Sequence, residues 1–266
     1  MICHIVDTIF KIKSKAMLKT LQILYHQGKQ YIPDLRNAKV PGIFRGRPEI
    51  SLEKVDEQAL ADVCPTNAIS RGPLAVDLGK CTFCGECSRL FPKKISFTTD
   101  YKLSTNERTR LIITEGITSQ INLNPELIRK EIQKLFSGSL KLRQVSAGGD
   151  NSTELELNAC GNVNFDIGRY GIEFVASPCH ADGIVITGPI SKNMAEPLEI
   201  TYKAVPSPKI IILAGTDAIS GGIFEGSPAL DRTFIEKNHI DLYVPGNPVH
   251  PLTFINGVMD LLGITP

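Results

Sequence analysis

The chain of 266 residues lacks several features that would place it in a familiar class of protein. No apolar run approaches the roughly 20 residues that a membrane-spanning helix needs. The N-terminus also lacks the basic-then-apolar order of a secretory signal. The sequence contains no low-complexity tract and no internal repeat. We therefore expect a globular, cytoplasmic chain without a transmembrane segment, long enough for two small domains.

Nucleotide-binding motifs are absent too. No G-x-x-x-x-G-K-[ST] occurs, and no G-x-G-x-x-G follows the first strand expected in the C-terminal half. The net charge is only +1, but residues 1–50 carry nine Lys and Arg against three Asp and Glu, so this segment is +6 and the remainder is −5. Because the basic stretch is short and lacks an aromatic stacking pattern, we expect no nucleic-acid partner.

The basic N-terminal segment predicts a helix. Residues 9–28 combine apolar and lysine positions at helical spacing, and the pattern ends near Gly28. A basic amphipathic helix can lie on an anionic membrane or dock on a partner subunit. It can equally pack on its own protein, and the sequence leaves these alternatives open.

The cysteines are the most specific feature of the sequence. Three of the seven follow the spacing C-x2-C-x2-C: Cys81, Cys84 and Cys87. A bacterial ferredoxin run ends in a fourth cysteine followed by proline, but that position is Phe91. In two-cluster ferredoxins, each cluster takes its fourth ligand from the other run. Cys64, which precedes Pro65, is therefore the predicted fourth ligand.

The second cluster of such an arrangement has lost all its ligands. Counted back from Cys64 with the same spacing, three of its ligand positions are occupied by Lys54, Glu57 and Leu60. Its fourth ligand position, before Pro92, is Phe91. The remaining four thiolates predict one [4Fe-4S] cluster, with a zinc ion held by the same thiolates as the alternative. Where the lost run stood, we expect a helix that continues through its three positions. The stretch "KISFTTD" after Pro92 predicts the strand that closes this small module.

The sequence pattern changes from about residue 120 onward. The stretch "NPELIRKEIQKLF" predicts a helix with Asn124 as N-cap and Pro125 in the first position. Five apolar strands follow, each with a turn and a helical stretch: "LKLRQV", "IEFVA", "GIVITG", "KIIILAG" and "DLYVPG". This alternation predicts an α/β domain with a parallel sheet covered by helices on both faces. Its binding crevice should lie beyond the carboxyl ends of the strands.

Several stretches make the C-terminal part resemble a known family. They are "STELELNA", "DIGRYGIEFVASPCHADGIVITGPISKNM", "KIIILAGTDAISGGIF" and "YVPGNPVHPLTFINGVMDLLG". They resemble the small, cluster-carrying subunit shared by complex I, as its B subunit, and by group 4 membrane-bound [NiFe] hydrogenases. The arm and the cysteine module resemble the fused N-terminal part of a formate-hydrogenlyase-like branch. Because this likeness begins at Met17, we expect residues 1–16 to be an extension or to follow a misassigned start.

The resemblance implies a three-part organisation. A basic arm and connector occupy residues 1–48, and a small α+β ferredoxin-like domain with the [4Fe-4S] cluster occupies residues 49–105. A flavodoxin-like domain occupies residues 120–266. The implied partners are a large subunit of the hydrogenase or complex I type and further subunits of a membrane arm. The expected place is the cytoplasmic face of the membrane, reached through these partners.

The departures from the family pattern concern its second cluster. In the family, cysteines of a C-x2-C-E element and of two later loops bind a proximal [4Fe-4S] cluster. The matching positions here are Asp150, Thr153, Asp217 and Asn247. None offers the soft sulfur that such a cluster needs, so the resemblance implies that the proximal cluster is lost. All four offer oxygen, which leaves a polar, water-filled pocket or a hard cation such as Mg²⁺ or Ca²⁺ as alternatives.

No catalytic residue is predicted in the chain. Cys179 and His180 are adjacent, and neighbours in sequence seldom bring a thiolate and an imidazole within hydrogen-bond reach. We therefore expect a non-catalytic, iron–sulfur subunit that transfers electrons through one cluster. The alternative is a scaffold subunit with a structural cluster, in a complex that has lost its hydrogenase chemistry.

Overall fold

The computed structural model describes residues 17–28 and 30–264. The chain divides into two compact units, residues 1–33 and residues 34–266. The expected boundaries of the three domains stay predictions. No helix in the described part of the chain is long and apolar enough to cross a membrane.

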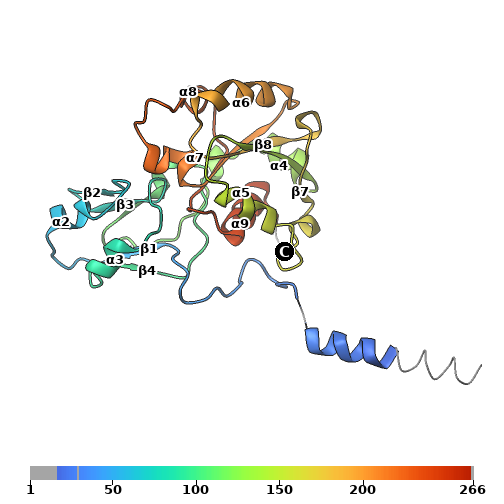
Figure 1. Ribbon diagram of the computed structural model, residues 1–266, viewed down its shortest axis with the longest axis horizontal. Helices are drawn as coiled ribbons and strands as arrows, with labels where there is room; N and C mark the ends of the chain where they lie inside the picture. Colours follow the sequence, from blue (N-terminus) through green and yellow to red (C-terminus); the bar gives the residue numbers. More distant parts are fainter. Residues whose placement is uncertain (1–16, 29, 265–266) are drawn as a thin grey trace, which may run out of the picture. The chain divides into compact units, whose positions relative to one another are not determined.

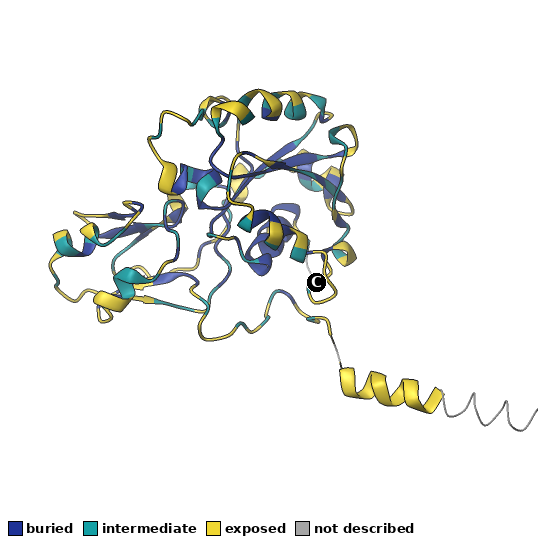
Figure 2. Cartoon of the chain, viewed as in Figure 1, coloured by how far each residue is buried: buried dark blue, intermediate teal, exposed yellow. Residues whose placement is uncertain are grey.

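The described residues of the first unit contain one helix. Residues 17–27 are helical, and the N–H of Gly28 donates to the carbonyl of Leu24 at 3.2 Å. Gly28 has a φ of +60°, a conformation that glycine adopts without strain. The predicted helix end is therefore confirmed, whereas residues 9–16 of the prediction lie outside the described residues. Figure 2 shows this helix as exposed along its whole length.

The second unit is built around a five-stranded parallel sheet. Its strands are β6 (Leu140–Ser146), β7 (Ile172–Phe174), β8 (Gly183–Thr187), β9 (Ile210–Ala214) and β10 (Leu242–Val244). Their order is β10-β9-β8-β6-β7, and all neighbouring pairs are parallel. Every residue of β8 and β9 is buried, as expected for central strands covered on both faces. The predicted α/β fold is confirmed, and so is each of the five strands.

Helices cover both faces of this sheet. Figure 1 shows α5 (Ser152–Ala159) and α9 (Pro251–Leu262) on one side, and α6 (Lys192–Ala204) and α8 (Thr233–Lys237) on the other. Every residue of α9 except Asp260 is buried, so α9 lies at the centre of the apolar core. The remaining helical elements are α4 (Lys130–Phe136), α7 (Thr216–Ser220), η1 (Arg108–Leu111), η2 (Pro125–Leu127), η3 (Ile167–Tyr170), η4 (Pro178–His180) and η5 (Gly222–Phe224).

The helix predicted from residue 125 onward is wrong as a single element. Asn124 does act as an N-cap, but of η2, where its side chain accepts the N–H of Glu126 at 3.1 Å. The chain is extended at Arg129 before α4 begins. There the guanidinium donates to both carboxylate oxygens of Asp241, at 2.9 and 3.0 Å. This two-pronged ion pair with a buried carboxylate favours the break over a continuous helix.

The cysteine module is a small α+β structure in the same unit. Two antiparallel strands, β1 (Pro48–Ile50) and β4 (Ile95–Phe97), form one sheet. A second sheet contains β2 (Ile69–Ser70), β3 (Ala75–Asp77) and β5 (Ile112–Thr114). The helices are α2 (Glu57–Asp62) and α3 (Glu86–Leu90). The strand predicted from "KISFTTD" is confirmed as β4.

The helix expected at the lost ligand run is shorter than predicted. It begins at Glu57, because the carboxylate of Asp56 accepts the N–H groups of Gln58 and Ala59 at 3.0 and 3.1 Å. Lys54 therefore lies in the preceding loop and not in α2. Leu60 is fully buried and belongs to the same apolar cluster as Phe91. Two of the four positions predicted to have lost a ligand thus make apolar contacts, Leu60 within this cluster and Phe91 packed against it.

A buried lysine holds the loop beside these positions. Lys94 is only 3% exposed, and its ammonium donates to the carbonyls of Ser51 and Glu53 at 2.7 and 2.8 Å. It also pairs with the carboxylate of Glu115 at 2.9 Å. All three ammonium hydrogens thus have an acceptor, which is the condition for burying such a charge.

Replacing Lys94 with methionine should destabilise the chain by about 3 kcal/mol, because it strands a carboxylate and two carbonyls. The measurement is urea unfolding followed by circular dichroism. Lys93→Met is the matched control, since Lys93 is exposed and should change the free energy of unfolding by less than about 0.5 kcal/mol. Equal unfolding free energies for the two variants would contradict this role of Lys94.

Candidate functional site

The four predicted cluster cysteines surround one cavity. Cys64 follows α2, Cys81 and Cys84 lie in the loop between β3 and α3, and Cys87 is in the first turn of α3. All four line this cavity, whose other walls are largely apolar: Val63, Ala68, Ile69, Val76 and Phe97. Cys64 is separated in sequence from the other three cysteines by β2 and β3, and the fold brings all four sulfur atoms to one cavity.

The loop conformation directs backbone N–H groups toward the sulfur atoms. Phe83, which precedes Cys84, has a φ of +54°, and its N–H donates to Cys81 Sγ at 3.3 Å. The N–H of Ala68 donates to Cys64 Sγ at 3.2 Å. Hydrogen bonds to sulfur are one of the means by which a protein sets the potential of an iron–sulfur cluster.

Burial keeps the thiols protonated when nothing compensates their charge. Burial, together with the neighbouring cysteines, raises the pKa of Cys81 to about 12 and that of Cys87 to about 11. A metal centre must therefore displace these protons to bind, which is how thiolate sites couple metal binding to proton release. Four thiols around one cavity have the donor chemistry of such a centre.

The geometry of the sulfur atoms bears on the kind of centre. In the described residues, no group of three or more His, Cys, Asp or Glu side chains gathers closely enough to hold a single metal ion. A zinc ion needs every sulfur about 2.3 Å from one point. A four-iron cluster instead distributes its cysteines over four irons, so that its ligands need only surround a cavity. The four cysteines line one cavity.

The four positions that the family resemblance matches to a proximal cluster lie at the carboxyl edge of the large sheet. Asp150 is exposed before α5, where its Oδ1 accepts the N–H and the hydroxyl of Ser152 at 3.0 and 2.7 Å. These bonds hold the pKa of Asp150 below its usual value. Thr153 is buried in the first turn of α5, Asp217 lies in α7, and Asn247 lies in the loop after β10.

Asp217 has the least favourable surroundings of these side chains. Its Oδ1 is buried and has no hydrogen-bond partner among the described residues. Burial raises its pKa, and the charges of Asp150 and Glu154 raise it further. A Cβ at Gly222 would lie 1.8 Å from this oxygen, so only glycine fits there. This edge of the sheet is therefore polar and acidic, and its four side chains offer oxygen atoms and no thiol.

Glu154, which the family resemblance matches to the glutamate of the C-x2-C-E element, is held by hydrogen bonds from two hydroxyl groups. It is 4% exposed and accepts the hydroxyls of Ser146 at 2.6 Å and Thr187 at 2.7 Å. These two hydroxyls stand at the ends of β6 and β8. Glu154 therefore anchors α5 to the edge of the sheet.

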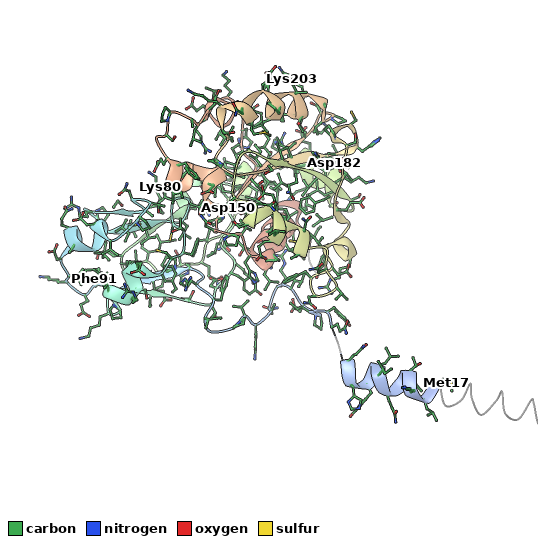
Figure 3. The ribbon with its side chains drawn as sticks, in the orientation of Figure 1. Met17, Lys80, Phe91, Asp150, Asp182 and Lys203 are labelled. Atoms are coloured by element: carbon green, nitrogen blue, oxygen red, sulfur yellow. The ribbon has the colours of Figure 1, made fainter. Side chains whose placement is uncertain are left out.

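The hydroxyl of Thr216 connects the cysteine loop to the loop after β10. Thr216, fully buried, donates to the carbonyl of Cys81 at 2.8 Å and lies 3.3 Å from the carbonyl of Gly246. Nearby, Lys80 and Glu225 form an ion pair at 2.6 Å, and Figure 3 shows Lys80 where the cysteine module meets the large sheet. Sequence reasoning missed Thr216, whose only signal is its place beside Asp217.

A groove runs between the two sites. It has a volume of about 430 Å³ and is lined by both Cys84 and Asn247, together with Phe44, Phe83 and His250. Cys84 is the exposed member of the four cysteines. The exposed cysteine thus opens into the same groove as the loop after β10.

The two other cysteines of the described residues, Cys160 and Cys179, do not line the cavity. Cys160 is buried at the end of α5, where burial raises its pKa, and Cys179 is exposed in η4. Cys3 lies outside the described residues. The cavity thus takes its sulfur from the four predicted cysteines.

Comparison with known proteins gives consistent matches. The sequence profile of the family described as NADH ubiquinone oxidoreductase, 20 kDa subunit, matches residues 151–261. The probable membrane-bound hydrogenase subunit mbhJ of Pyrococcus furiosus is 32% identical over 129 residues, which are 48% of this chain and 77% of that protein.

In two further relatives, the match covers a smaller share of the relative's own length. The B subunit of NADH-quinone oxidoreductase from Geotalea daltonii is 37% identical over 107 residues, 40% of this chain and 62% of that protein. Formate hydrogenlyase subunit 7 of Escherichia coli is 32% identical over 137 residues, 52% of this chain and 54% of that protein. The chain thus spans less than two thirds of the length of both relatives.

Proposed function

The chain belongs to the family of the 20 kDa subunit of NADH-ubiquinone oxidoreductase, and we propose that it is an iron–sulfur subunit of a membrane-associated complex. The family resemblance inferred from the sequence is confirmed. Three relatives bear the names of a membrane-bound hydrogenase subunit, an NADH-quinone oxidoreductase subunit and a formate hydrogenlyase subunit. The complex is accordingly of the complex I or group 4 hydrogenase type.

The observation that carries this proposal is the single cavity shared by Cys64, Cys81, Cys84 and Cys87. These cysteines hold one [4Fe-4S] cluster, which supplies one-electron transfer when bound. The chain's own part is to ligate the cluster, to donate backbone N–H groups to two sulfurs and to exclude water with apolar walls. It provides no catalytic residue of its own.

The proposed electron route ends differently from that of the family. Asp150, Thr153, Asp217 and Asn247 stand where the family has cysteine, and oxygen ligands do not support an iron–sulfur cluster. No proximal cluster forms, so electrons pass between the cluster and another partner. We expect the exchange at Cys84, because it is the exposed cysteine of the set.

The loss of the proximal cluster also favours a second candidate, a scaffold subunit whose cluster is structural. Potentiometric titration of the purified complex, followed by electron paramagnetic resonance, separates the two. An electron-transfer cluster is reduced and reoxidised reversibly, and its signal changes when the complex turns over. A cluster that stays in one oxidation state during turnover would support the scaffold.

The partners are a large subunit of the hydrogenase or complex I type and subunits of a membrane arm. The helix of residues 17–27 supports docking on them or on the cytoplasmic membrane face. Leu18, Leu21 and Leu24 share one side of this helix and are 57%, 54% and 58% exposed. Exposed apolar side chains in a basic segment are typical of a helix that covers its apolar face on binding.

Charging that apolar side should release the chain from membranes. In cell fractionation, the double variant Leu21→Asp with Leu24→Asp should move from the membrane pellet to the supernatant, at least about ten-fold, because two carboxylates oppose burial. The matched control, Gln22→Asp with Gln27→Asp, adds the same charge to the helix but leaves all three leucines in place. Equal release of both double variants, or of neither, would contradict docking by the apolar face.

A further inference from the structure

Arg45, in the connector before β1, lies over the cysteine loop. Its Nε donates to the carbonyl of Phe83 at 2.5 Å. A Cβ placed on Gly85 would lie 3.1 Å from Arg45 Cδ, so the arginine stem crosses the backbone between the last two cysteines of the run. Arg45 and Cys84 together line two surface grooves. One is the groove of about 430 Å³ that also contains Asn247, and the other also contains Gly42 and Ser88. A side chain from outside the cysteine run thus reaches its most exposed ligand.

The charge of Arg45 is not compensated by an ion pair. In the described part of the chain, no carboxylate lies within ion-pairing distance of its guanidinium, whereas two other arginines of this region are paired. Arg47 contacts Glu49 at 3.3 Å, and Arg89, in α3 near Cys87, contacts Glu86 at 2.5 Å. Arg45 therefore brings a net positive charge to the cysteine loop, and Arg89 does not.

We propose that Arg45 is a positioning residue that fixes the Cys81–Cys84 loop and raises the reduction potential of the cluster. This inference rests on the proposed function, because it needs a cluster in the cavity. A reduced cluster carries one more negative charge than an oxidised one, and a nearby cation stabilises the reduced form more strongly. The guanidinium keeps its charge at every cellular pH, so the effect does not depend on titration.

The test is a potentiometric titration of the anaerobically purified full chain. Dithionite supplies the single electron, and electron paramagnetic resonance follows the reduced cluster. For Arg45→Gln, which removes the charge, we expect an equilibrium constant of reduction lowered about ten-fold, or about 59 mV for one electron. Arg45→Lys keeps a cation and should restore most of the wild-type potential. The double variant Glu86→Gln with Arg89→Gln removes a neutral ion pair and should leave the potential unchanged.

The outcomes separate this inference from the proposed function. Wild-type protein without iron would contradict the proposed function itself. Wild-type iron content with an unchanged potential in Arg45→Gln, or an equal drop in the Glu86→Gln and Arg89→Gln double variant, would overturn the role of Arg45 alone. Should Arg45→Gln fail to retain iron, Ile43→Glu decides. Ile43 is 88% exposed in the same grooves, and a carboxylate there should lower the potential by neutralising Arg45. A wild-type potential in Ile43→Glu would overturn the proposal.

Discussion

Replacing Cys84 with serine should lower the iron content of the purified chain from about four atoms to less than about one. Cys84 lines the same cavity as the other three cysteines, and the substitution removes one thiolate from a complete set. Because no fifth cysteine lines the cavity in the described residues, the remaining three ligands leave one iron without its protein ligand. The measurement is iron and acid-labile sulfide content after anaerobic purification.

Cys179→Ser is the matched control for this loss. Cys179 is also an exposed cysteine, but it lies in η4 and does not line the cavity. The control should therefore keep about four irons per chain. Equal iron in the Cys84 and Cys179 variants would show that the cavity does not hold the cluster.

Placing cysteine at the four positions that the family resemblance matches to a proximal cluster should raise the iron content to about eight atoms per chain. The variant combines Asp150→Cys, Thr153→Cys, Asp217→Cys and Asn247→Cys. The supporting loops retain the glycines that close approach requires, such as Gly215, with a φ of +98°, and Gly246, with a φ of +146°. Cysteine at residue 217 would also remove a carboxylate whose Oδ1 is buried without a partner among the described residues.

The readout is a second signal by electron paramagnetic resonance together with the iron count. Substitution of the same four positions by serine provides the control, because it changes the same loops without adding sulfur. A folded four-cysteine variant that holds no more than about four irons would show that the loops, and not only the ligands, have diverged. Proximal-cluster loss would then involve the backbone as well.

The strands and the cysteine set could be predicted because they depend on local patterns. Apolar runs of strand length bounded by turns indicated the five parallel strands, and all five are present. The spacing of Cys81, Cys84 and Cys87, with Cys64 before proline, indicated four residues that the fold does bring to one cavity. Both inferences use information within a few residues, or a spacing with a known geometric meaning.

The misses concern contacts between residues that are distant in sequence. The helix expected from residue 125 onward breaks because Arg129 pairs with Asp241, 112 residues away. The contact of Lys94 with the loop at Ser51 spans 43 residues. Thr216 reaches Cys81 across 135 residues, and Arg45 reaches Phe83 across 38. No local pattern in the sequence indicates these partners, since each side chain is an ordinary loop or helix residue until the fold places it.

The most direct test of the account is the metal content of the unmodified full chain, purified anaerobically with the partners that accompany it. We predict about four irons and about four labile sulfides per chain, and one [4Fe-4S] signal by electron paramagnetic resonance after reduction. A content near about eight irons, with a second cluster signal in the native protein, would contradict the loss of the proximal cluster. One zinc per chain without iron would contradict the iron–sulfur assignment of Cys64, Cys81, Cys84 and Cys87.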